Sequence, residues 1–157
     1  MAVPSPHGEL ATALAHAAAV AAGARDPWWI IGSAAAFLHG ARTPVADIDV
    51  LMSADDAFAA LDAAGVAASG GEASDLFCSE VFGTIRGTHL PIEVFGGFRI
   101  RTGQHWQPVV LKTRVAVAVE GFTLWVPARD ELAALFRSFG RPKDLARAAL
   151  LDSLAGG

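Results

Sequence analysis

The sequence predicts an α+β fold in which helices flank a mixed β-sheet. Short apolar segments of strand length alternate with alanine-rich helical segments, two hairpin patterns follow, and two helical segments close the chain. Strands grouped together and followed by helices are typical of α+β domains. The 157 residues are about the length of one domain, so we expect a single domain over residues 1–157 with C-terminal helices within 130–154.

Residue patterns place the individual elements. Helices are predicted at residues 7–24, 33–39, 53–64, 130–139 and 142–154, strands at 28–31, 47–52, 80–85, 89–95, 114–119 and 122–126, and a loop at 68–74. Ser33 and Ser53 lie near helix starts, where serine is favoured, and Gly40 is a typical helix stop. Gly96-Gly97 is expected to end a strand. Residues 98–112 match neither pattern and receive no assignment.

Composition limits the classes of protein that fit. Hydrophobic residues make up 53% of the chain and charged residues 18%, which supplies a core and argues against disorder. No apolar run approaches the ~20 residues needed to cross a bilayer. Cys78 is the only cysteine, which excludes an intramolecular disulfide and a cysteine zinc site. These observations predict a cytoplasmic protein without a membrane partner.

Charge is unevenly distributed. The net charge is −4, with an excess of acids in residues 1–98 and an excess of Lys and Arg in residues 99–157. An acidic chain is not expected to bind long nucleic acids tightly without sequence preference. The basic part either faces the phosphates of a substrate or reflects ordinary variation in surface charge.

Asp47-Ile48-Asp49 is the strongest functional signal. Residues i and i+2 of a strand point the same way, with Cα atoms roughly 6.5–7 Å apart, so both carboxylates can reach one Mg²⁺ or Mn²⁺ ion. Strands disfavour Asp, and two like charges 4 Å apart repel by ~4 kcal/mol at an effective dielectric of 20. An exposed strand edge is the alternative, but the apolar residues 50–52 indicate a buried strand.

Glu93 is a candidate third ligand. It lies in the apolar segment 91–95, and an acid in such a strand usually needs a partner. It either completes the metal site or is a surface or salt-bridged residue. Glu80 is a weaker candidate, because it is predicted at the start of its strand.

Gly32-Ser33, between a strand and a helix, suits a phosphate. Glycine allows a ligand to approach the backbone, and N–H groups at a helix start bind anions. An ordinary turn is the alternative. Arg42 and Lys143 are candidates for nucleotide binding. The alternative for Arg42 is that it caps the region of His39, and the alternative for Lys143 is that it is a solvated helix residue.

The order of these motifs resembles that of the DNA polymerase beta-type nucleotidyltransferase superfamily. Gly-Ser is followed after thirteen residues by Asp-x-Asp, and a later acid lies in an apolar strand. The similarity is best with its small stand-alone prokaryotic members, some of which serve in toxin–antitoxin systems. It implies a nucleotidyltransferase-like fold, with nucleotide phosphates at Gly32 and Ser33. It also implies that Asp47, Asp49 and Glu93 are catalytic and bind Mg²⁺ or Mn²⁺. The family more often has Asp at the third position.

The sequence therefore supports two hypotheses. The first is metal-dependent nucleotidyl transfer from a nucleoside triphosphate to an unknown acceptor, favoured by the intact Gly-Ser and Asp-x-Asp motifs. The second is a noncatalytic interaction module with the same fold, acting with a protein partner in, for example, a toxin–antitoxin pair. The short chain, which leaves little sequence for an acceptor domain, favours the second hypothesis or a homodimer.

Overall fold

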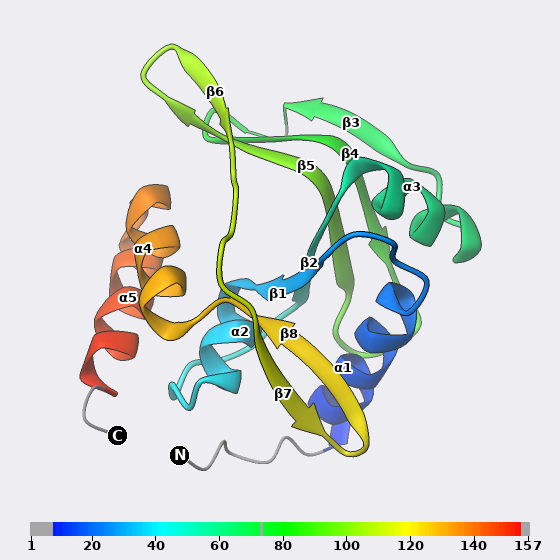
Figure 1. Cartoon of the computed structure of the whole chain (residues 1–157), viewed down its shortest axis with the longest axis horizontal. Coiled ribbons are helices and arrows are strands. Elements are labelled where there is room, and N and C mark those ends of the chain that lie inside the picture. The colour runs from blue at the N-terminus through cyan, green and yellow to red at the C-terminus, as the bar shows by residue number, and fades with distance from the viewer. Residues whose placement is uncertain (1–7, 73, 155–157) are drawn as a thin grey trace.

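A six-stranded mixed β-sheet dominates the computed structural model, which describes residues 8–72 and 74–154 (Figure 1). Its strands are β1 (Trp29–Ile31), β2 (Ile48–Met52), β3 (Ser69–Glu72), β4 (Phe77–Ile85), β5 (Ile92–Thr102) and β6 (His105–Pro108). They follow the order β1-β2-β5-β4-β3, with β6 paired to β5. β2 and β5 are parallel and the other pairs are antiparallel, which confirms the predicted mixed sheet.

Five helices and a separate hairpin complete the described structure. The helices are α1 (Gly8–Ala21), α2 (Gly32–Leu38), α3 (Ala54–Ala63), α4 (Arg129–Phe139) and α5 (Pro142–Ser153), and the hairpin pairs β7 (Val115–Val119) with β8 (Phe122–Val126). In Figure 1, α4 and α5 lie together on one side of the molecule, and α1 and α3 lie on the other. None of the described helices has the length and hydropathy of a membrane span.

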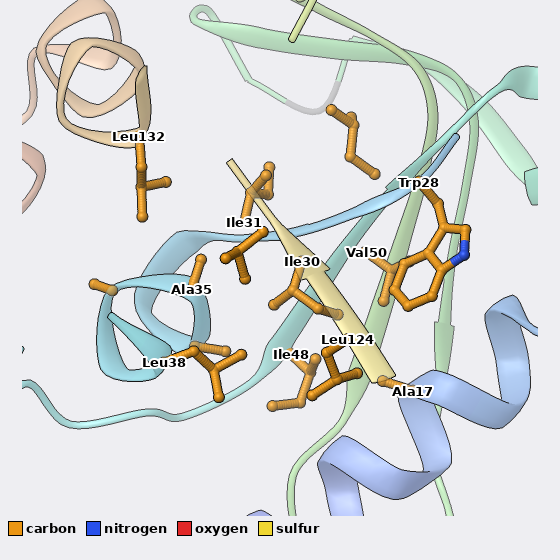
Figure 2. Packing of buried hydrophobic residues seen from close by; sticks show 14 of the residues in the cluster. Ala17, Trp28, Ile30, Ile31, Ala35, Leu38, Ile48, Val50, Leu124 and Leu132 are labelled. Carbon is orange, nitrogen blue, oxygen red and sulfur yellow. The ribbon is translucent and has the colours of Figure 1, made fainter. Parts of the chain in front are cut away.

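The core lies against one face of β2 and β5. Ile48 and Val50 of β2 and Val94 of β5 are fully buried, and Ile30 and Leu124 pack in the same cluster (Figure 2). Burying an aliphatic side chain contributes about 1.5–3 kcal/mol. Because side chains alternate along a strand, the residues between these core positions point to the opposite face, toward α4 and α5.

The structure corrects several predicted boundaries. The predicted loop at 68–74 contains β3, which pairs with β4, and residue 73 of it lies outside the described residues, as does the predicted helix residue His7. Gly96-Gly97 does not end a strand, since β5 continues to Thr102. A Cβ at Gly96 would lie 2.5 Å from the Cβ of Ala57, so this glycine permits close packing of α3. Residues 98–112 contain the end of β5 and all of β6.

Ser33 lies near the start of α2, as predicted, but it is the second residue of the helix and not its N-cap. The chain passes from β1 directly into α2 at Gly32, where φ is +69°, and the N-cap is Ile31, which provides no side-chain hydrogen bond. Glycine adopts this left-handed conformation at little cost, so it makes the sharp turn possible. The Ser33 side chain is therefore not committed to capping.

Asp56 connects α3 to the segment before β1. Its carboxylate accepts hydrogen bonds from the backbone N–H groups of Asp26 at 2.8 Å and Arg25 at 3.1 Å. Burial by itself raises the pKa of Asp56, but these N–H donors outweigh it and hold the pKa below its usual value. The ionised carboxylate therefore stabilises the folded state.

We expect Asp56→Ala to lower the free energy of unfolding by about 2 kcal/mol near pH 7, because two partly buried N–H groups lose a charged acceptor. Because the folded-state pKa is depressed, this contribution is present above the unfolded pKa of about 3.9 and is lost as pH falls through the folded value. Urea denaturation at several pH values measures it. The exposed neighbour Asp55→Ala, also in the first turn of α3, is the control. Equal effects of the two substitutions would contradict the assignment.

Candidate functional site

Three carboxylates meet on the face of the sheet opposite the core. Asp49 of β2 lies directly beside Glu93 of β5 in the parallel register, and Asp47 comes just before β2. Each offers one oxygen, and the three oxygens lie within 4.8 Å of one another. The prediction that Asp47 begins the strand is wrong by one residue, because the ladder starts at Ile48, whose N–H binds the carbonyl of Pro91. The predicted grouping of the acids is present.

The electrostatics of this cluster are unfavourable without a cation. Asp49 Oδ1 is buried and accepts no hydrogen bond from the described part of the chain. Burial raises the pKa of Asp49 well above its usual range, and the charges of Asp47 and Glu93 raise it further. Burial also raises the pKa of Glu93, with a further contribution from Asp47. Three oxygen ligands and an unpartnered carboxylate oxygen fit a hard divalent cation.

Gly32 fits closely against the cluster. A Cβ at this position would lie 2.5 Å from Asp49 Oδ2, much closer than van der Waals contact. The positive φ and the missing side chain are thus both required, one for the turn into α2 and the other for the position of the carboxylate. Ser33, the next residue, is buried and borders the same pocket.

The pocket has a volume of about 270 Å³ and two walls of opposite character. Asp47, Asp49 and Glu93 form the acidic wall. Arg141, Lys143 and Arg147 of the α5 region form the facing basic wall, and phenylalanines of β4, β5 and α4 supply apolar surface between them. Opposite walls of this kind suit a ligand that combines a cation with a polyanion.

Asp144 holds the basic wall in place. It is fully buried and binds Arg141 through Nε at 2.6 Å and through a terminal nitrogen at 3.0 Å, while Arg147 lies 3.9 Å away. The guanidinium of Arg141 also lies 4.8 Å from the ring centre of Phe77, a cation–π contact. Of this wall the sequence predicted only Lys143. The missed arginines had one signal, the Arg-Pro-x-Asp pattern at the start of a helix.

Other candidate residues lie outside the pocket. Arg42 is exposed in the segment after α2 and does not line it, so its binding role stays a prediction. His39 donates from Nε2 to the carbonyl of Pro127 at 2.7 Å, and burial lowers its pKa. Glu80 lies within β4 rather than at a strand start, and it pairs with Arg99 at 2.9 Å.

Comparisons with known proteins identify the fold. No protein-family model matches the chain, and no curated protein sequence matches it. Solved structures do match. The structure of a candidate nucleotidyltransferase from Thermotoga maritima gives a TM-score of 0.70 at 22% identity, and the alignment covers 90% of this chain and 89% of that one. The protein has a nucleotidyltransferase fold.

Two further structures agree. ANT(2'')-Ia in complex with adenylyl-2''-tobramycin gives a TM-score of 0.56 at 15% identity, over 93% of this chain and 89% of that one. An antigenic nucleotidyltransferase-like protein from Paracoccidioides brasiliensis gives a TM-score of 0.56 at 15% identity, over 97% of this chain and 79% of that one. At these identities the similarity is one of fold, so the function is argued from the site.

Gly32→Ala tests the close fit between Gly32 and Asp49. We expect it to lower the free energy of unfolding by about 1–2 kcal/mol from backbone strain alone, and by more from the clash with Asp49 Oδ2. In an Asp49→Ala background only the strain remains, so the cost of Gly32→Ala falls. A double-mutant cycle by denaturant unfolding measures this coupling. Additive effects would show that the glycine serves only the turn.

Proposed function

We propose that the protein transfers a nucleotidyl group from a nucleoside triphosphate to the hydroxyl of an acceptor, with Mg²⁺ or Mn²⁺ held by Asp47, Asp49 and Glu93. The observation that carries the proposal is the unpartnered Asp49 Oδ1 within three acids, facing a basic wall across one pocket. A metal-bound triphosphate has the charge distribution that this pocket complements.

The acidic wall supplies the chemistry at the transferred phosphorus. A divalent cation bound there would stabilise the charge on the reacting phosphoryl group and the leaving pyrophosphate. Glu93 is only half-buried and lines the pocket beside the other two acids, so an acceptor hydroxyl can reach its carboxylate. It accepts the proton of the acceptor hydroxyl as the new O–P bond forms and the bond to pyrophosphate breaks.

The basic wall and the Gly-Ser turn bind the rest of the triphosphate. Arg141 presents the terminal nitrogen that Asp144 does not bind, Arg147 presents its guanidinium group, and Lys143 adds a mobile ammonium. Gly32 borders the pocket with its backbone alone, against which the Asp49 carboxylate lies, and Ser33 is the next lining residue. One structural neighbour was solved with adenylyl-2''-tobramycin, which supports a small hydroxylated molecule as one class of acceptor.

Asp49→Asn tests whether the Asp49 carboxylate serves nucleotidyl transfer at a cost in folding stability. With α-labelled nucleoside triphosphates, Mg²⁺ and host extract, we expect the wild type to transfer label and release pyrophosphate. The variant should lose several orders of magnitude in rate through loss of a metal ligand. It should also melt at a higher temperature than the metal-free wild type, because one buried like charge is gone. Metal should raise the melting temperature of the wild type only.

The exposed acid Asp62 of α3 offers the control Asp62→Asn, which should change neither rate nor metal response. If no nucleotide labels any acceptor, and the protein instead captures one protein partner regardless of Asp49, the noncatalytic interaction module replaces this proposal. A toxin–antitoxin pair is one such setting.

Lys143→Ala tests the basic wall. The chain has only two lysines, and Lys112 lies outside the pocket, so Lys112→Ala is a matched control. We expect Lys143→Ala to weaken binding of metal–triphosphate by about tenfold, since one charged hydrogen bond is lost, with an unchanged melting temperature. Calorimetry with Mg²⁺ and each nucleoside triphosphate measures it. Equal affinities of the two variants would remove Lys143 from the site.

A further inference from the structure

A second cavity, of about 400 Å³, lies on the same face of the sheet as the pocket lined by Asp47, Asp49 and Glu93, which we call the acid pocket. We call the second cavity the β1 groove. Its lining includes Trp29, Leu51 and Phe98, the paired side chains of Glu80 and Arg99, and the segment 108–111. That segment belongs to the strand-to-strand connection that Figure 1 shows descending from β6 past β1 to β7.

Strand register places the groove beside the carboxylates. Ile31, Asp49 and Glu93 are register partners across β1, β2 and β5, and the next row on the same face is Trp29, Leu51 and Phe95. Successive rows on one face are roughly 6.5–7 Å apart. Phe98 lines both cavities. A ligand anchored at the acids therefore reaches the groove with a spacer of about one sugar ring.

The groove combines an apolar surface with one polar edge. Glu80 and Arg99 form an ion pair at 2.9 Å, with both side chains about half exposed. Gly97, at a φ of +63°, has no Cβ to clash with the Glu80 carboxylate, which lies against the backbone of β5. The pair thus presents a hydrogen-bond acceptor and a donor side by side, next to the aromatic surface of Trp29 and Phe98. Small-molecule sites have this composition and size.

We infer that the β1 groove binds the base of the nucleoside triphosphate whose phosphates occupy the acid pocket, a step that rests on the proposed function. Glu80 accepts a hydrogen bond from an exocyclic amino group of the base, and Arg99 donates to a ring nitrogen or carbonyl on the same edge. Glu accepting from cytosine N4 and Arg donating to guanine are established pairings of this type. Adenine and cytosine present an exocyclic amino group beside a ring-nitrogen acceptor, which is the donor–acceptor order that this pair complements.

Calorimetry on the full chain with Mg²⁺ tests the inference, using inorganic tripolyphosphate, UTP, ATP, CTP and GTP as ligands. At least one nucleotide should bind about tenfold more tightly than tripolyphosphate, as expected for one hydrogen bond to a charged group. Glu80→Leu, which leaves no hydrogen-bond acceptor at this position, should abolish that preference and leave tripolyphosphate affinity unchanged. Asp152→Leu removes a similar exposed ion pair, with Arg137, outside the groove, and should preserve the preference.

The outcomes separate this inference from the proposed function. If tripolyphosphate binds as tightly as every nucleotide, or if Glu80→Leu leaves the preference unchanged, the base does not occupy the groove, while nucleotidyl transfer stands. If Glu80→Leu lowers label transfer at unchanged nucleotide affinity, the groove holds the acceptor and the inference is overturned. If neither tripolyphosphate nor any nucleotide binds with Mg²⁺, the proposed function fails with it.

Discussion

The parallel pairing of β2 with β5 is the constraint on which the site depends. Only this register sets Asp49 directly beside Glu93, because their positions on two strands distant in sequence become neighbours in the ladder. Parallel strands need a crossover, and here α3, β3 and β4 provide it between the two strands. The same pairing buries Ile48, Val50 and Val94 on the other face. One ladder thus builds both the core and the acidic cluster.

The two faces of this ladder oppose each other energetically. On one face, aliphatic side chains leave water and stabilise the fold. On the other, three acids share a site in which one oxygen of Asp49 is buried and the pKa of Asp49 is raised, which costs stability as the cluster ionises. The rigid core keeps the carboxylates together despite their repulsion. Strain and like-charge clustering that a fold tolerates at one place are typical of functional sites.

The parts of the site that depend on local chemistry were predictable from the sequence. The i, i+2 spacing of Asp47 and Asp49 and the apolar surroundings of Glu93 indicated the acids, and Gly32 was singled out as a close-approach position. The close contact of Gly32 with Asp49 depends on the register of β1 against β2, which spacing alone does not determine. The resemblance to nucleotidyltransferases predicted the fold that the structural neighbours show.

Features set by tertiary packing were not predictable in the same way. Gly96 reads as a strand breaker, yet it lies within β5 because α3 packs where a side chain would be. β3 is rich in glycine and becomes a strand only because the edge of β4 accepts it. The Arg-Pro-x-Asp pattern is the only local signal at Arg141, and Arg147 has none. The position of both opposite the acids depends on how α5 packs against the sheet.

Asp144 explains how a pocket with walls of opposite charge stays open. Cations facing an acidic cluster across a small cavity are attracted to it, and a direct ion pair would close the site. The buried carboxylate of Asp144 instead forms a hydrogen-bonded ion pair with Arg141 and a longer ion pair with Arg147. It also accepts a hydrogen bond in the capping box at the start of α5. The arginines are thereby directed toward the pocket without collapsing onto Asp49. The acidic first part of the sequence and its basic second part thus meet across one pocket, as the proposed binding of a metal-bound triphosphate requires.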